Sequence, residues 1–258
     1  MSTKLKIAAA VAAAVLLSAC SSPKHEPMPL VNFTPSMEVT EVWSKGLSSA
    51  EGFLVPAVYD DMVFAAGGKT LTRLNARTGE TEWSVSFDSP ITGGVGSDGY
   101  VTAVGLWDGN LEVVDAEGKV SWEKKLTTEL ASPPVVSHGL VIARTMDTRV
   151  SAFEASSGEL QWTYQKSQPA LTVRLPTRML AHDNFLLVGQ PNGHIVILDI
   201  ASGKPVFEFQ VAQAKGVTEV ERLVDVVGAP AFSENLVCAA AFQGAVTCVD
   251  STNGQTKW

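Results

Sequence analysis

Short apolar runs separated by turn-forming residues fill most of the chain after residue 38, and no window keeps the 3.6-residue period of an amphipathic helix. Residues 141–143 and 195–198 are apolar at consecutive positions, as in a strand that is covered on both faces. Asn192-Gly193 and Gln243-Gly244 each suit a two-residue hairpin loop, where glycine tolerates a positive φ. The pattern predicts an all-β protein of short antiparallel strands.

One sequence unit recurs through the chain. Each copy has an apolar run, a polar turn, a glycine and an aromatic residue, and the aromatic residues lie about 43 residues apart on average. The copies span 70–83, 110–122, 149–162, 194–207 and 245–258; their glycines are Gly79, Gly118, Gly158, Gly203 and Gly254, and their aromatic residues are Trp83, Trp122, Trp162, Phe207 and Trp258. A sixth tryptophan, Trp43, has no such unit before it.

Each repeat has room for about four strands, and a period of about 40–45 residues with four strands is the pattern of a β-propeller blade. We therefore predict a β-propeller of four-stranded antiparallel blades, in which the aromatic residue covers the face of a neighbouring blade. An acceptor side chain, able to bond backbone N–H groups of the turn, recurs as Asn75, Asp115, Glu154, Asp199 and Asp250. Because a catalytic carboxylate would occur once, these positions are structural.

The N-terminal segment has a different pattern from the repeats. Lys4 and Lys6 precede an apolar stretch, residues 7–17, that is too short to span a bilayer. The stretch ends in Leu17-Ser18-Ala19-Cys20, which resembles a bacterial lipobox. In such a sequence the peptide is cut before the cysteine, whose thiol then carries lipid.

We accordingly interpret residues 1–19 as a lipoprotein signal peptide. Residues 20–38 contain the lipidated Cys20 and a proline-rich flexible linker, and residues 39–258 form the blades. Several acyl chains would hold the protein at a membrane. Ser21 after the cysteine is typical of outer-membrane lipoproteins, so we expect a lipid-anchored protein at the periplasmic face of the outer membrane.

Composition and motif spacing argue against several kinds of site. The formal net charge of −8 argues against a nucleic-acid-binding face. The segment 94–99 matches G-x-G-x-x-G, but the β-type run 100–104 follows it in place of the helix that a phosphate site requires. The histidines are His25, His138, His182 and His194, and they lack paired ligand spacing. No catalytic residue, metal or cofactor is predicted.

Cys238 and Cys248 lie on either side of the hairpin turn at Gln243-Gly244. With a plain two-residue turn their side chains would point to opposite faces of the sheet, whereas one extra residue would bring them together. The oxidising compartment permits a disulfide. Both outcomes remain open on the sequence.

Two connections between repeats are longer than the others: the one from Trp162 to Pro176 and the one from Phe207 to Pro230. Extra loop on a rigid scaffold is where binding residues concentrate. The candidates, which combine apolar and charged side chains, are Leu171, Val173, Arg174, Arg222, Leu223 and Asp225. Such a mixture suits a protein–protein contact, and loops after consecutive blades should be neighbours.

The repeat L-x-x-x-D-x-x-[TS]-G-x-x-x-W resembles the pyrroloquinoline-quinone (PQQ) type propeller repeat. Together with the lipobox, it makes the chain similar to the BamB family of outer-membrane lipoproteins. The resemblance implies a non-enzymatic scaffold of the β-barrel assembly machinery that aids insertion of outer-membrane proteins. That family closes a ring of eight blades, so we expect five blades in an open arc, with three blades or about 130 residues beyond residue 258.

The resemblance also assigns a role to the two long loops. The family's L-x-L-R motif corresponds to Leu171-Thr172-Val173-Arg174, and its R-[LI]-x-D-x-D motif corresponds to residues 222–227, where Val227 replaces the second acid. In the family these motifs hold the POTRA domains of a BamA-type barrel subunit. Nascent outer-membrane proteins are a further expected partner.

Two alternative functions stay open. A PQQ-dependent periplasmic dehydrogenase has a similar repeat, but it needs a Ca²⁺ site of Glu, Asn and Asp, a catalytic Asp and adjacent cysteines over the quinone. Cys238 and Cys248 are ten residues apart, and no such set of acids converges in the sequence. A generic adhesion or sugar-binding propeller is the third interpretation.

Overall fold

The computed structural model describes residues 31–32, 34–48, 54–167, 169 and 171–258. The chain forms two compact units, Met1–Glu41 and Val42–Trp258. The predicted signal peptide, the lipidation site Cys20 and much of the predicted linker lie outside the described residues. In the described part of the chain, no helix has the length and apolar character that a transmembrane span requires.

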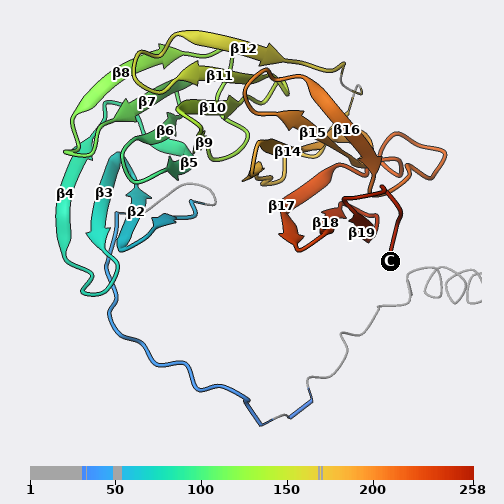
Figure 1. Ribbon diagram of the computed structural model, residues 1–258, viewed down its shortest axis with the longest axis horizontal. Coiled ribbons are helices and arrows are strands. Elements are labelled where there is room, and N and C mark those ends of the chain that lie inside the picture. Colours follow the sequence, from blue (N-terminus) through green and yellow to red (C-terminus); the bar gives the residue numbers. More distant parts are fainter. Residues whose placement is uncertain (1–30, 33, 49–53, 168, 170) are drawn as a thin grey trace, which may run out of the picture. The chain divides into compact units, whose positions relative to one another are not determined.

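The second unit consists of five antiparallel sheets, which follow one another along an open arc (Figure 1). The first contains β1 (Ala57–Tyr59), β2 (Met62–Gly67), β3 (Thr70–Asn75) and β4 (Thr81–Ser86), and the second contains β5 (Ile91–Ser97), β6 (Thr102–Leu106), β7 (Asn110–Val114) and β8 (Val120–Lys125). The third contains β9 (Val135–Ser137), β10 (Leu140–Arg144), β11 (Val150–Glu154) and β12 (Leu160–Tyr164). These sheets, and the two that follow, confirm the predicted blades and open arc.

The fourth sheet contains β13 (Leu180–His182), β14 (Phe185–Gln190), β15 (His194–Asp199) and β16 (Pro205–Gln210), with a 3₁₀ turn, η1 (Pro191–Gly193), between the middle strands. The fifth contains β17 (Val226–Ser233), β18 (Leu236–Ala241) and β19 (Val246–Asp250). Thr256 forms a bridge with Val249 beside β19. In each four-stranded sheet the strands lie in chain order, and the last strand is on the outside of the arc (Figure 1).

The hydrophobic core lies between blades. Val141 on β10 packs with residues of the second blade, whereas its neighbour Ile142 packs with residues of the fourth. Both side chains are fully buried because both faces of the strand are covered. This alternation explains why the middle strands are apolar at consecutive positions.

The repeated tryptophans join each blade to the next at the outer rim. The indole N–H of Trp122, on β8 of the second blade, donates to the carbonyl of Ala155, at 2.8 Å, in the last turn of the third blade. Its ring lies on Gly158, where an added Cβ would be 2.8 Å from Cδ2 of the indole. Equivalent bonds run from Trp43 to Ala76, from Trp83 to Ala116 and from Trp162 to Ile200. We call these four contacts the rim locks.

The turns that receive the tryptophans are built as predicted. Oδ1 of Asn75 accepts hydrogen bonds from the backbone N–H groups of Arg77 and Thr78, at 3.0 and 3.1 Å. Asp115 and Asp199 accept equivalent backbone bonds, and so does Asp250 in the turn that receives Phe207. The Glu154 side chain accepts none within the described chain, where Ser157 Oγ accepts from the N–H of Glu159, so the prediction was wrong for that copy. The repeated glycine has a positive φ, for example 71° at Gly158, which a residue with a side chain adopts only with strain.

Two predicted hairpin loops are one residue longer than expected. Gln190 pairs with His194, so Pro191 joins Asn192 and Gly193 in the loop, where a missing backbone N–H does not interrupt the ladder. The N–H of Ala241 bonds the carbonyl of Ala245, so the second loop comprises residues 242–244. The prediction of two-residue loops at these sites was therefore wrong.

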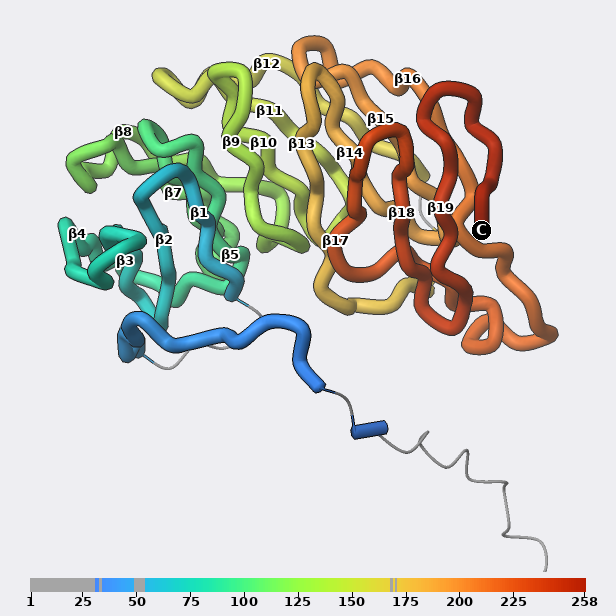
Figure 2. The backbone as a smooth tube through the Cα atoms, turned by 60° about the horizontal axis from the view of Figure 1, so that its bottom comes forward, coloured from blue at the N-terminus to red at the C-terminus, as the bar shows by residue number. Residues whose placement is uncertain are grey.

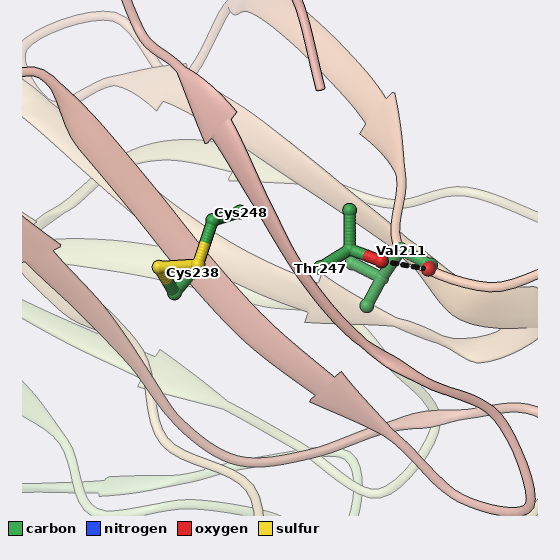
Figure 3. Close-up of a disulfide and its surroundings, with 4 residues drawn as sticks. All are labelled: Val211, Cys238, Thr247 and Cys248. Carbon is green, nitrogen blue, oxygen red and sulfur yellow. Dashed lines mark hydrogen bonds between the residues drawn. A yellow bond between two sulfur atoms is a disulfide. The ribbon is translucent and has the colours of Figure 1, made fainter. Parts of the chain in front are cut away.

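The longer second loop sets the register of β18 and β19. Cys238 lies directly opposite Cys248, with their Cα atoms 4.1 Å apart, and a disulfide joins the two side chains (Figure 3). The extra loop residue thus has the effect that a bulge would have had, because it brings both cysteines to one face of the sheet. The bond crosses the two strands near the second long loop.

The G-x-G-x-x-G segment has a packing role. Its first residues belong to β5, and the strand β6 follows, as expected from the sequence. A Cβ on Gly96 would lie 2.0 Å from the carbonyl oxygen of Pro134, and one on Gly94 would lie 2.7 Å from the ring of Pro133. The glycines allow the second and third blades to approach closely at their inner strands.

Candidate partner-binding site

The two long connections emerge beside β17. The first loop, residues 165–179, runs from β12 to β13, and the second loop, residues 211–225, runs from β16 to β17. In Figure 2 the described parts of both loops can be followed at the lower side of the blades that contain β13 to β19. Their ends are joined by a parallel bridge between Thr177 and Gly228, in which Arg178 N–H donates to Gly228 and Gly228 N–H donates to Pro176.

Asp225 fixes the first loop to the second. Its side chain is only 6% exposed, and its carboxylate accepts hydrogen bonds from the backbone N–H groups of Val173, at 2.5 Å, and Asn192, at 3.3 Å. Hydrogen bonds to a carboxylate are stronger than those between neutral groups. One buried acid therefore ties together the first loop, the start of β17 and the 3₁₀ turn of the fourth blade.

The second loop is fixed at its beginning as well. The carbonyl of Val211 accepts a hydrogen bond of 2.7 Å from the hydroxyl of Thr247, which is next to the disulfide cysteine Cys248 (Figure 3). The N–H of Val211 donates to Gly193 at 2.7 Å. The start of the second loop is thus hydrogen-bonded to both the fourth and the fifth blades.

The tip of the second loop presents apolar side chains on an ordered turn. Oε2 of Glu221 accepts hydrogen bonds from the N–H groups of Thr218 and Val217, at 3.0 and 2.9 Å, and these bonds lower the pKa of that carboxyl. Val217 is 96% exposed and Val220 is 60% exposed. Exposed valines on a turn held by such bonds are suited to contact another protein.

The six candidate residues differ in how deeply their side chains are buried. Leu171, Arg174 and Arg222 are exposed, and neither arginine side chain forms a hydrogen bond or ion pair with another residue that the structure describes. Val173 and Leu223 are half-buried. Asp225, in contrast, is buried, and its bonds are internal. The exposed candidates are therefore apolar or basic, while Asp225 joins the two loops from within.

A cavity of about 360 Å³ lies beneath the loops and adjoins three of the candidates, Val173, Arg174 and Asp225. Its walls also include Arg144 and Gln190, which the sequence analysis did not select. Arg144 is the last residue of the apolar strand β10. A charged residue directly after the apolar run 140–143 was the signal that could have identified it.

Metal coordination finds no support in this part of the chain. Among the described residues, no group of three or more His, Cys, Asp or Glu side chains gathers where an ion could be held. His138 and His182 lie at hairpins and His194 begins β15; His25 lies outside the described residues.

The chain is similar to known proteins both in sequence and in structure. A sequence profile described as "Outer membrane protein assembly factor BamB" matches residues 67–258. The curated protein of that name from Burkholderia pseudomallei is 38% identical over 256 residues, which are 97% of this chain and 67% of the relative. The crystal structure of BamB from Moraxella catarrhalis has a TM-score of 0.72 and 28% identity, covering 80% of this chain and 63% of that one.

A quinohemoprotein alcohol dehydrogenase from Comamonas testosteroni is also similar in structure, with a TM-score of 0.62 over 81% of this chain and 42% of that one. Its sequence identity of 18% shows a common fold alone. The chain thus spans about two thirds of the length of the curated relative described above and less of the solved structures.

Proposed function

This chain belongs to the family of the outer membrane protein assembly factor BamB, and on that basis we propose that it is a non-enzymatic scaffold of the machinery that inserts β-barrel proteins into the outer membrane. In this proposal, Cys20 carries the lipid that anchors it at the periplasmic face. The two loops bind the POTRA domains of the BamA-type barrel subunit. Nascent outer-membrane proteins are further candidates for contact.

The observation that carries the proposal is the bond from Val173 to Asp225. It joins loops from consecutive blade connections into one surface before any partner arrives, so little conformational freedom remains to be lost on binding. Leu171 and Arg174 lie on that surface with their side chains exposed. Arginine is one of the residue types that most often dominate the binding energy of protein interfaces.

A dehydrogenase is the alternative, because quinohemoprotein enzymes share the fold. The curated relatives that match this chain are named as assembly factors. We favour the scaffold because the features that depart from the repeat are two surface loops.

Charge reversal in the first loop tests the proposal. We expect Arg174→Glu to reduce co-purification of the barrel subunit at least tenfold at raised salt, because an arginine at the centre of an interface contributes about 2 kcal/mol or more. The matched control is Lys119→Glu, an exposed residue in a turn of the second blade. Circular dichroism should show both variants folded. Equal co-purification by Arg174→Glu and Lys119→Glu would contradict the assignment of the loops.

A further inference from the structure

The cavity beneath the loops is lined by buried polar groups that lack a protein partner. Nε and Nη1 of Arg144 form no hydrogen bond within the described chain, and the residue is 5% exposed. The same is true of Oγ of Ser132, Oγ1 of Thr177 and Nε2 of Gln190, all of them residues of this one cavity. Most of the buried side-chain nitrogen and oxygen atoms that lack a hydrogen-bond partner in the described chain therefore belong to residues that line this cavity.

Such a concentration is unusual for a packed protein. Buried polar groups are nearly always hydrogen-bonded, and a buried charge without a partner is more costly than a buried neutral group. The rim locks show that the same fold satisfies its polar atoms elsewhere. These polar groups are therefore available to form hydrogen bonds with a ligand that enters the cavity.

The charges indicate an anion. Burial lowers the pKa of Arg144 to about 10, and the carboxylate of Asp225 acts in the opposite direction, so the guanidinium is charged at neutral pH. Among the lining residues, Arg174 and Leu175 are exposed, whereas Arg144, Thr177 and Gln190 are buried. With two arginines and one aspartate, the walls carry a net positive charge.

We propose that this cavity is a carboxylate-binding site, in which Arg144 receives the carboxylate and Thr177 and Gln190 donate hydrogen bonds to it. The planar guanidinium matches the two oxygens of a carboxylate. Asp225 would repel a doubly charged phosphate more strongly than a singly charged carboxylate, and its own oxygens already accept hydrogen bonds from Val173 and Asn192. The carboxylate can belong to an acidic side chain of a protein or to a small free acid, and the site holds independently of the POTRA assignment.

The test is ligand-observed saturation-transfer NMR on the full chain in detergent. The probes are acetyl-Gly-Glu-Gly-amide for a side-chain carboxylate and butyrate for a singly charged free acid, with acetyl-Gly-Gln-Gly-amide as the neutral match. We expect transfer to a carboxylate probe and none to the glutamine peptide. Transfer to the glutamate peptide alone assigns the site to a protein side chain, and transfer to butyrate also admits free acids.

Variants show whether the cavity is responsible. Arg144→Met should weaken binding of the probe at least tenfold. Thr177→Val and Gln190→Met, which keep the charge and nearly the volume, should each weaken it two- to fivefold, and they decide the matter if Arg144→Met does not fold. The proposal is overturned if neither carboxylate probe shows transfer, if the variants bind as the parent does, or if inorganic phosphate displaces the peptide probe at lower concentration than butyrate does.

Discussion

At the outer rim of the blades the tryptophan donors have hydrogen-bond partners, whereas at the inner cavity several buried donors have none within the described chain. At the rim, Trp83, Trp122 and Trp162 each donate their indole N–H to a carbonyl of the next blade while the ring packs on its glycine. At the cavity, Arg144 and Gln190 keep donors buried without a protein partner. Both regions are built by strands of the same repeat.

The rim contacts are part of the repeated motif, whereas the polar residues around the cavity are not. The rim positions recur in each copy because every blade must bind its neighbour. Arg144, Thr177 and Gln190 have no counterparts in the repeated motif, and they gather only where the two long loops leave the blades. Residues outside the repeat are therefore the better guide to function in this fold.

The largest expected effect comes from breaking a rim lock. Gly158→Ala should lower the free energy of unfolding by about 3–5 kcal/mol, because its Cβ would meet the Trp122 ring and its φ of 71° is unfavourable for alanine. Urea denaturation followed by tryptophan fluorescence measures it.

The matched control is Gly139→Ala in the third blade. Gly139 has nearly the same φ, 72°, but an added Cβ would have no atom within 4 Å. It should cost only about 1–2 kcal/mol, the cost of the backbone conformation alone. Equal losses for the two variants would mean that the tryptophan contact contributes nothing.

A smaller effect is expected from a buried charge inside a regular blade. Glu112 on β7 is opposite Glu123, and burial, reinforced by Glu123 and Asp108, raises the pKa of Glu112 to about 7. The folded protein therefore binds this proton more tightly than the unfolded chain does, so stability falls as the pH rises from about 4.5 to above 7.

Glu112→Gln should remove that dependence. It should raise the free energy of unfolding by about 1–2 kcal/mol at pH 8 and leave it nearly unchanged at pH 5. Denaturation at the two pH values provides the measurement, and Glu117→Gln, at an exposed turn of the same blade, is the control. A loss of stability at pH 8 would show that the ionised carboxylate stabilises the blade.

The smallest effect comes from completing the row of rim locks. Phe207 packs on Gly254 as the tryptophans pack on their glycines, but it has no N–H to donate and is 42% exposed. Phe207→Trp should add a bond to the carbonyl of Ser251, the position that corresponds to Ala155 in the third blade, and stabilise the protein by about 0.5–1.5 kcal/mol. Thermal unfolding should show a higher midpoint, whereas Phe207→Leu should lower it.

Much of the fold was predictable because the same sequence pattern recurs in several copies along the chain. The turn acceptor at Asn75, the glycine at Gly158 and the aromatic residue at Trp122 each have the predicted place. The hairpins at Pro191–Gly193 and at 242–244 were predicted one residue too short, because strand register depends on which backbone groups pair across the sheet.

The candidate site was predictable only in part. Loop length pointed to the first and second loops, and their residues Arg174 and Arg222 are exposed. The internal role of Asp225 could not be foreseen, since Val173 is distant in sequence and its N–H is one donor among many.

The sequence by itself determined the blades, their order and the contacts that join them, because each of these is local or recurs at a fixed period. Only the tertiary structure decided what the non-repeating residues do. It placed Asp225 under the first loop, Cys238 opposite Cys248, and Arg144 in the wall of a cavity. Such placements depend on how three blades and two loops meet in space, and no periodic pattern along the chain encodes them.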